Sequence, residues 1–109
     1  MSVRLSSDEA WEVLAHAHTG ILTSLRRDGR PITLPVWFAV LDRRIYVSGP
    51  ATAKRHARVR RDPRVAFLVE SGERWAELRA VHVAGLARIV DEPGLLTRVA
   101  AALDAKYGA

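Results

Sequence analysis

The feature that most constrains the fold is a series of short β-strand patterns joined by tight turns. Asp28-Gly29 separates residues 20–27 from residues 30–40, a segment rich in β-branched and aromatic side chains. An Asp-Gly pair between two such segments is a strong signal for a β-hairpin. Further strand patterns follow at residues 44–48, 64–70 and 78–90, and a helical pattern separates one strand pair alone. This order favours a mainly β fold, a small β-barrel with flanking helices, over a βαβ sheet.

Three details refine the expected strands. Pro35 has no N–H to donate to a ladder, so its strand should be bulged or open on one side, where backbone can face a ligand. Residues 64–70 are apolar on both faces, which indicates a central strand buried on each side. Gly85 in the last strand pattern predicts a bulge or a bend at a barrel corner.

Helical signals stand at both ends of the chain. Ser6 and Glu9 have capping-box spacing, which predicts a first helix that ends near Thr19 and Gly20. A short basic helix is expected at about residues 52–61, and a last helix opens at Pro93, with Gly108 as its C-cap. No linker, repeat or low-complexity tract interrupts the pattern, so residues 1–109 are predicted to form one domain.

Composition excludes several classes of protein. The chain is 49% hydrophobic, which gives a core and argues against disorder. It contains no cysteine, so disulfides, thiolate metal sites and cysteine nucleophiles are excluded. No apolar run approaches the ~20 residues of a membrane span, and no signal-peptide core is visible at the N-terminus. We therefore expect a cytoplasmic protein with no membrane association.

The net charge of +5 is concentrated in one segment. Residues 54–64 hold six basic side chains against Asp62, while the rest of the chain has eleven basic and eleven acidic residues. Lys54, Arg58 and Arg61 follow helical spacing on one face, and the loop before them leaves N–H groups at the helix start, which suits a phosphate. The alternative is a solvated face in an arginine-rich chain. Aromatic interleaving and a helix-turn-helix pattern are both absent, which does not favour nucleic acid.

No constellation of catalytic side chains is visible in the sequence. There is no nucleophile motif, and the histidines lack metal-ligand spacing. They are His16, His18, His56 and His82. Chemistry would therefore have to come from a bound cofactor. Trp37 is open to three interpretations: core, subunit interface or contact with a planar ligand. Trp75 lies in an expected turn, where a subunit interface is favoured over contact with substrate.

Several segments resemble a known family. The most specific are Asp28-Gly29-Arg30-Pro31, Pro35-Val36-Trp37-Phe38, the run from Arg61 to Val65, and the strand from Glu77 to Gly85. In this order, over roughly residues 10–107, the sequence resembles the pyridoxamine 5′-phosphate oxidase-like split β-barrel flavoproteins, including their deazaflavin-dependent branch. The resemblance implies a split β-barrel of the FMN-binding type and a homodimer with two cofactor sites at the subunit interface.

The resemblance also implies site residues. Four residues of one strand would face the cofactor ring: Thr33, Leu34, Pro35 and Val36. Ser48 would lie near the ribityl chain, and the phosphate would be held by Thr52, Ala53, Lys54 and Arg55. Arg58 is expected at the cofactor tail, where some relatives have Asn, and Leu34 stands where many have Ser or Thr.

One departure from the family concerns the C-terminus. Relatives usually continue into another strand, and the vitamin B6 oxidases place basic substrate-binding residues there. We therefore do not expect oxidation of pyridoxamine phosphate. Either the barrel is a strand short or the sequence is part of a longer protein.

The expected function is hydride transfer between a phosphate-bearing flavin-type cofactor, FMN or an F-420 type deazaflavin, and a small-molecule substrate. Six cations exceed what one phosphate needs, which slightly favours the deazaflavin with its charged tail. Two alternatives stay open. One is a carrier that binds the cofactor or haem without turnover, and the other is a small nucleic-acid-binding barrel.

Overall fold

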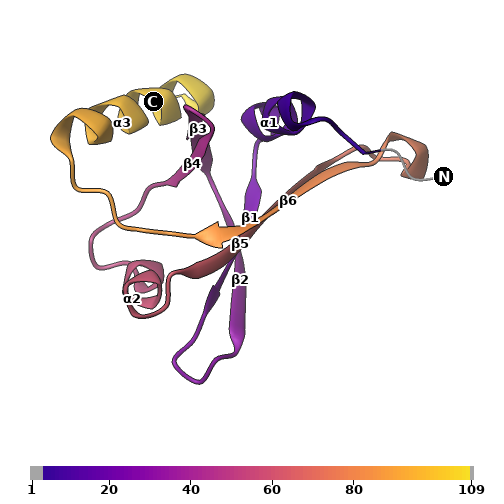
Figure 1. Cartoon of the computed structure of the whole chain (residues 1–109). Coiled ribbons are helices and arrows are strands. Elements are labelled where there is room, and N and C mark those ends of the chain that lie inside the picture. The colour runs from indigo at the N-terminus through magenta and orange to yellow at the C-terminus, as the bar shows by residue number, and fades with distance from the viewer. Residues whose placement is uncertain (1–3, 109) are drawn as a thin grey trace.

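The computed structural model describes residues 4–108 (Figure 1). Its helices are α1 (Ser7–His16), α2 (Lys54–Arg61), the 3-10 turn η1 (Trp75–Glu77) and α3 (Pro93–Tyr107). Its strands are β1 (Gly20–Leu25), β2 (Pro31–Val36), β3 (Phe38–Leu41), β4 (Arg44–Val47), β5 (Arg64–Ser71) and β6 (Arg79–Leu86). Within the described residues, no helix is long and apolar enough to cross a lipid bilayer.

The strands form two antiparallel sheets and no closed barrel within residues 4–108. One sheet has the order β2-β1-β5-β6, and β3 pairs with β4 alone. The predicted antiparallel β-strands with flanking helices are therefore confirmed, whereas a closed barrel is not seen among the described residues, and the fold is mixed α/β with antiparallel sheets. Closure fails because β6 and β4, which end their sheets, do not pair with each other; after β6 the chain runs to α3 beside the β3–β4 hairpin (Figure 1).

The local signals at turns and helix ends are confirmed. Gly29 adopts a φ of 86°, and the Arg26 N–H donates to the Arg30 carbonyl across the predicted hairpin turn. Ser6 and Glu9 form the predicted capping box, although α1 ends at His16, earlier than expected, because Ala17 is extended. Gly108 caps α3 as predicted, with a φ of 81°.

The strand expected at residues 30–40 is divided into two. Val36 and Phe38 are both buried, whereas Trp37 between them is 56% exposed and belongs to neither strand. The chain changes sheets at this point, so β2 pairs with β1 and β3 pairs with β4. Since β2 is an edge strand, Pro35 lies where the sheet is open on one side, as predicted.

Two expectations about β5 and β6 need correction. β5 lies between β1 and β6, so its central position is confirmed, but only one of its faces is buried. Phe67 and Val69 point into the core, while Leu68 is 36% exposed on the other face. Gly85 pairs in register with Val65, so of the two alternatives predicted there the bulge is absent.

The end of α3 fastens the junction between β2 and β3. The Tyr107 hydroxyl accepts from the Phe38 N–H at 2.9 Å and lies 2.6 Å from the His18 carbonyl oxygen. The Lys106 ammonium donates to the Phe38 carbonyl at 3.1 Å and lies 3.6 Å from the centre of the Phe38 ring. Since Phe38 is fully buried, these contacts satisfy backbone groups that water does not reach.

Candidate functional site

Two adjoining cavities share a wall made by Ser48 and Arg55. The strand-end cavity, of about 410 Å³, lies between the end of β2 and the end of α3. Its lining is Pro35, Val36, Trp37, Ser48, Arg55, Leu103, Asp104, Tyr107 and Gly108. The inter-sheet cavity, of about 600 Å³, lies between the four-stranded sheet and β4, and its lining includes Ile45, Val47, Ser48, Arg55, Phe67 and Val83.

The strand-end cavity gathers four of the ten residues predicted for the cofactor. Pro35, Val36, Ser48 and Arg55 meet there, although they come from separate segments. The other six line neither cavity: Thr33, Leu34, Thr52, Ala53, Lys54 and Arg58. Thr52, Ala53 and Lys54 nevertheless immediately precede Arg55, so the predicted phosphate segment borders the cavity wall.

Arg55 is the best-positioned cation of the site. Its Nη2 donates to the Ser48 carbonyl oxygen, while its Nε is buried and has no hydrogen-bond partner among the described residues. A Cβ added to Gly49 would collide with Nη2, so the absence of a side chain at this glycine lets the guanidinium lie against the loop. A buried, unpaired N–H on a charged group is costly and is suited to an acceptor from a ligand.

The start of α2 adds to this anion-binding character. Its N-cap residue is Ala53, which provides no side-chain oxygen to cap the first turn. Uncapped N–H groups and the positive end of the helix dipole attract anions such as phosphate. Lys54, the first residue of the helix, is exposed beside them.

Two arginines of the predicted phosphate-binding face have a structural role instead. Arg58 Nε donates to the Ser24 hydroxyl at 2.9 Å, and Arg61 Nη2 donates to the Leu25 carbonyl at 3.1 Å. These bonds attach α2 to β1, and Ser24 is only 2% exposed. Arg58 and Arg61 thus lie on the same side of α2, as their spacing predicted, but this side packs against the sheet.

The residues expected along the ring alternate between the two faces of β2, because side chains of a strand alternate. Thr33 and Pro35 lie opposite Thr23 and Ile21 on β1, and the two threonine hydroxyls are 3.0 Å apart. Leu34 and Val36 point to the other face. A planar ligand contacting all four residues would therefore have to run along the exposed edge of β2.

An aromatic stack at the strand-end cavity was not predicted from the sequence. Trp37 lies parallel to Tyr107, with ring centres 4.3 Å apart, and His18 packs edge-on against both rings. Trp37 is not a core residue, so its remaining interpretations are an interface and contact with a planar ligand. Tyr107 was missed because its partner Phe38 is 69 positions away in the chain, beyond any local pattern.

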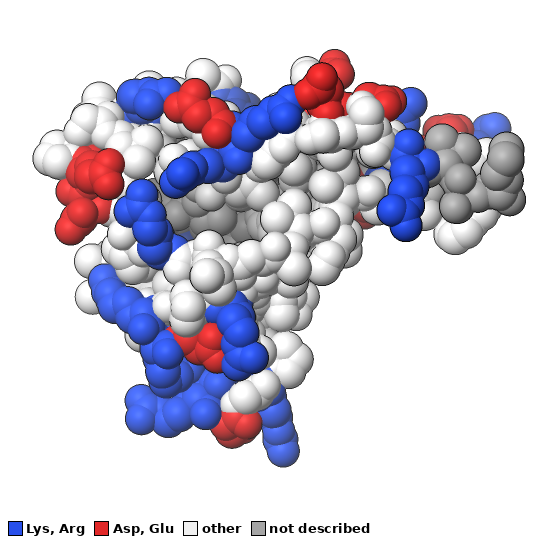
Figure 2. All heavy atoms as spheres, viewed as in Figure 1, with Lys and Arg blue, Asp and Glu red and all other residues white. Residues whose placement is uncertain are grey.

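The basic surface is broader than residues 54–64. Figure 2 shows lysine and arginine side chains gathered over α2 and the tip of the β1–β2 hairpin. The tip contributes Arg26, Arg27 and Arg30, all exposed. The acidic residues among them are paired: Asp62 with Arg64 at 2.8 Å, and Asp28 with Arg30 at 3.8 Å. Hydrogen bonds from Arg64 lower the pKa of Asp62 to about 2.

The described residues hold no cluster of three or more His, Asp or Glu side chains that could bind a metal ion.

Arg55 and the start of α2 provide an anion site, and the Trp37–Tyr107 stack provides an aromatic wall in the adjoining strand-end cavity. Such a site can hold and orient a planar ligand that carries a phosphate.

Comparison with known proteins identifies the family and the fold. The family model described as pyridoxamine 5′-phosphate oxidase matches residues 6–109. A conserved hypothetical protein from Mycobacterium tuberculosis has a similar structure, with 36% identity and a TM-score of 0.93, over 97% of this chain and 67% of that one. None of the curated proteins is significantly similar.

Two further structures share the fold. An FAD-binding protein from Mesorhizobium loti is 29% identical, with a TM-score of 0.74, over 96% of this chain and 76% of that one. A haem-binding protein from Mycobacterium smegmatis is 22% identical, with a TM-score of 0.78, over 96% of this chain and 45% of that one.

Proposed function

Since the chain belongs to the pyridoxamine 5′-phosphate oxidase-like split-barrel family, we propose that it is a flavin- or deazaflavin-dependent oxidoreductase. Its cofactor would be FMN or an F-420 type deazaflavin, and its substrate a small organic molecule. A bound cofactor of either kind would supply hydride transfer. The protein would supply binding, orientation and exclusion of water.

The observation that carries the proposal is the buried Nε of Arg55, which lacks a partner in the described chain. A phosphate oxygen is an acceptor of the right charge for this N–H. Lys54 and the uncapped first turn of α2 provide further donors close by. The residues present thus fit the phosphate end of the cofactor.

The ring would lie along the edge of β2, beside Pro35 and Val36. Edge strands leave backbone N–H and C=O groups without ladder partners, and such groups can pair with the polar atoms of a flavin-type ring. The Trp37–Tyr107 stack would shield one end of the ring from water. We assign no acid or base to the chain, so its residues would act by position and electrostatics.

The basic surface favours the deazaflavin over FMN. One phosphate can be satisfied by Arg55, Lys54 and a few N–H groups, which leaves the arginines at the hairpin tip without a role. The phospholactyl and polyglutamate tail of an F-420 type deazaflavin carries several negative charges that such a surface would attract. This preference is tested by comparing the two cofactors.

We propose a homodimer that buries the open face of the four-stranded sheet. Two rows of paired residues cross this face: Pro35, Ile21, Leu68 and His82, and beside them Thr33, Thr23, Ala66 and Ala84. Neither row contains Asp, Glu, Lys or Arg. Two adjacent rows without such charges are suited to contact with a second copy, and they include two of the residues expected at the ring.

Fluorescence titration of the purified protein with each cofactor tests the proposal. We expect quenching with at least one cofactor, and an affinity reduced about tenfold or more in Lys54→Ala/Arg55→Ala, because charge-assisted hydrogen bonds to phosphate are lost. Arg74→Ala, an exposed arginine of the η1 loop, is the matched control. No quenching by either cofactor would refute the assignment.

Turnover separates the oxidoreductase from a carrier. Tight binding without substrate-dependent oxidation or reduction of the cofactor would support a carrier, as would a preference for haem. Salt-sensitive binding of DNA that is weakened by Lys54→Ala/Arg55→Ala, with cofactor binding unchanged, would support the nucleic-acid alternative.

A further inference from the structure

The inter-sheet cavity is a second candidate binding site, distinct from the proposed cofactor site except at their shared wall. Its volume of about 600 Å³ lies within the range of small-molecule sites, roughly 300–1,000 Å³. Protein interiors contain few voids larger than a water molecule, because unfilled apolar space costs stability. A cavity of this size is therefore suited to an occupant.

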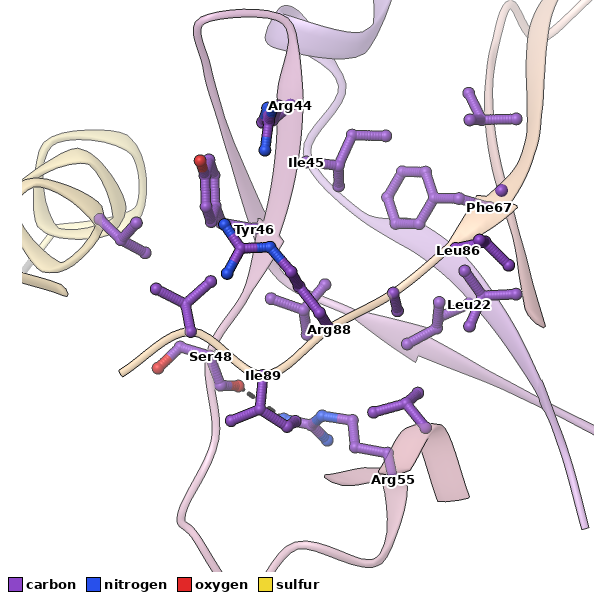
Figure 3. A pocket seen from close by; sticks show the side chains of 18 of the residues that line it. Leu22, Arg44, Ile45, Tyr46, Ser48, Arg55, Phe67, Leu86, Arg88 and Ile89 are labelled. Carbon is purple, nitrogen blue, oxygen red and sulfur yellow. Dashed lines mark hydrogen bonds between the residues drawn. The ribbon is translucent and has the colours of Figure 1, made fainter. Parts of the chain in front are cut away.

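The lining of the cavity is mostly aliphatic. Figure 3 shows Leu22, Ile45, Leu86 and Ile89 around it, with Phe67 at one side. Trp11 and Tyr46 are the other aromatic residues of the lining. Most of the remaining apolar lining is valine. The cavity has no parallel aromatic pair like the Trp37–Tyr107 stack of the strand-end cavity. This lining favours a flexible hydrocarbon chain over a planar ring system.

The polar lining is positive. Four arginines and His56 line the cavity, and no Asp or Glu does. Arg43 is paired with Asp8, and Arg55 is directed to the Ser48 carbonyl. Arg88 lies 3.7 Å from Glu92, and both side chains of this pair are 60% exposed, so the pair is readily exchanged.

Arg44 and Arg88 are therefore the cations available to a ligand in this cavity alone, because Arg55, with its unpaired Nε, belongs to the wall shared with the strand-end cavity. Arg44 has no salt-bridge partner among residues 4–108, and Arg88 extends from the segment after β6 toward Tyr46 of β4 (Figure 3). In Figure 2, a hollow near the middle of the molecular face has basic side chains on its rim. An apolar interior with cations at its mouth matches an apolar chain that ends in an anion.

From this match we propose that the inter-sheet cavity binds an amphipathic carboxylate, with its hydrocarbon chain among β4, β5 and β6 and its head group paired with Arg44 and Arg88. This site does not depend on the cofactor. It would let the protein take up a fatty-acid-like molecule beside the Ser48–Arg55 wall, either as a second ligand or as a substrate held next to the cofactor.

Isothermal titration with dodecanoate, dodecanol and butyrate tests the proposal on the whole chain. We expect dodecanoate to bind, dodecanol to bind more weakly because it lacks the charge, and butyrate not to bind because it buries too little apolar surface. The double variant Arg44→Gln/Arg88→Gln should lower the affinity for dodecanoate about tenfold, since two exposed ion pairs with the carboxylate are lost. The control Arg74→Gln, which removes an arginine outside the cavity, should leave this affinity unchanged.

A second variant tests the cavity itself. Val83→Phe places a ring in the void beside Phe67 and should abolish dodecanoate binding, while the melting temperature is unchanged or higher because space is filled. FMN or deazaflavin affinity, measured on the same samples, should be unaffected by Val83→Phe. A failed cofactor assignment would thus leave this result intact.

Three results would overturn the proposal. The first is no binding of dodecanoate, and the second is equal binding to a folded Val83→Phe variant. The third is a shift of the haem Soret band when haem is added to the native protein, together with loss of this shift in His56→Ala. Because His56 lines the cavity, that result would assign the cavity to haem.

Discussion

Removing the Tyr107 hydroxyl should destabilise the protein far more than its half-buried position at the end of α3 implies. Tyr107→Phe keeps the ring stacked on Trp37 but leaves the Phe38 N–H without its acceptor, 2.9 Å away. Phe38 is fully buried, so water cannot replace the bond. An unsatisfied buried donor costs about 1–3 kcal/mol. The two carbonyl oxygens that also contact the hydroxyl add little to this cost. The Phe38 carbonyl keeps its hydrogen bond from Lys106, and the carbonyl of the exposed residue His18 can bond to water instead.

We therefore expect a loss of about 2 kcal/mol in the free energy of unfolding, which corresponds to a drop in melting temperature of about 10 °C in a domain of this size. Urea denaturation followed by circular dichroism measures it, and the m-value should not change. Tyr46→Phe, in half-buried β4, is the control for loss of a tyrosine hydroxyl. A loss for Tyr107→Phe no larger than for Tyr46→Phe would refute the reasoning.

Three further predictions follow from the site, the acidic groups and the open sheet face. Gly49→Ala should weaken cofactor binding several-fold, because its Cβ displaces the guanidinium packed against it, whereas Gly94→Ala should not; fluorescence titration compares the two. Asp62 has a folded pKa of about 2, below its unfolded value, so its stabilising effect is present above about pH 4 and is lost as the pH falls toward 2. Asp62→Asn should lose this part of the pH dependence in urea melts, and an unchanged profile would contradict it. Leu68→Glu should convert the dimer to a monomer in light scattering, while Leu78→Glu, outside the two rows, should leave the mass unchanged; a dimer in both variants would exclude this face.

Local sequence signals predicted the elements whose partners are near in the chain. The capping box of Ser6 and Glu9, the turn at Gly29 and the C-cap at Gly108 depend on three to five neighbouring residues, and all three are confirmed. The proline at position 35 correctly indicated an open strand, because the missing N–H is a property of the residue itself.

Features that depend on distant partners could not be predicted in this way. The division at Trp37 and the unclosed sheets follow from which strands pair, which no local pattern specifies. Arg58 was predicted as a ligand contact, yet its guanidinium bonds to a serine of β1, 34 positions earlier. Ser48 and Arg55 were each predicted to bind the cofactor, but their contact with each other was not predicted, because it depends on the loop at Gly49.

In the proposed function, Lys54 and Arg55 recognise the phosphate of a flavin-type cofactor. The most direct test measures binding of FMN and of phosphate-free riboflavin to the native chain and to Lys54→Ala/Arg55→Ala, with the same comparison for the deazaflavin and its phosphate-free core. We predict that the variant loses about 10- to 100-fold in affinity for the phosphate form and almost none for the phosphate-free ring. An equal loss for both forms, or no loss for either, would contradict the claim.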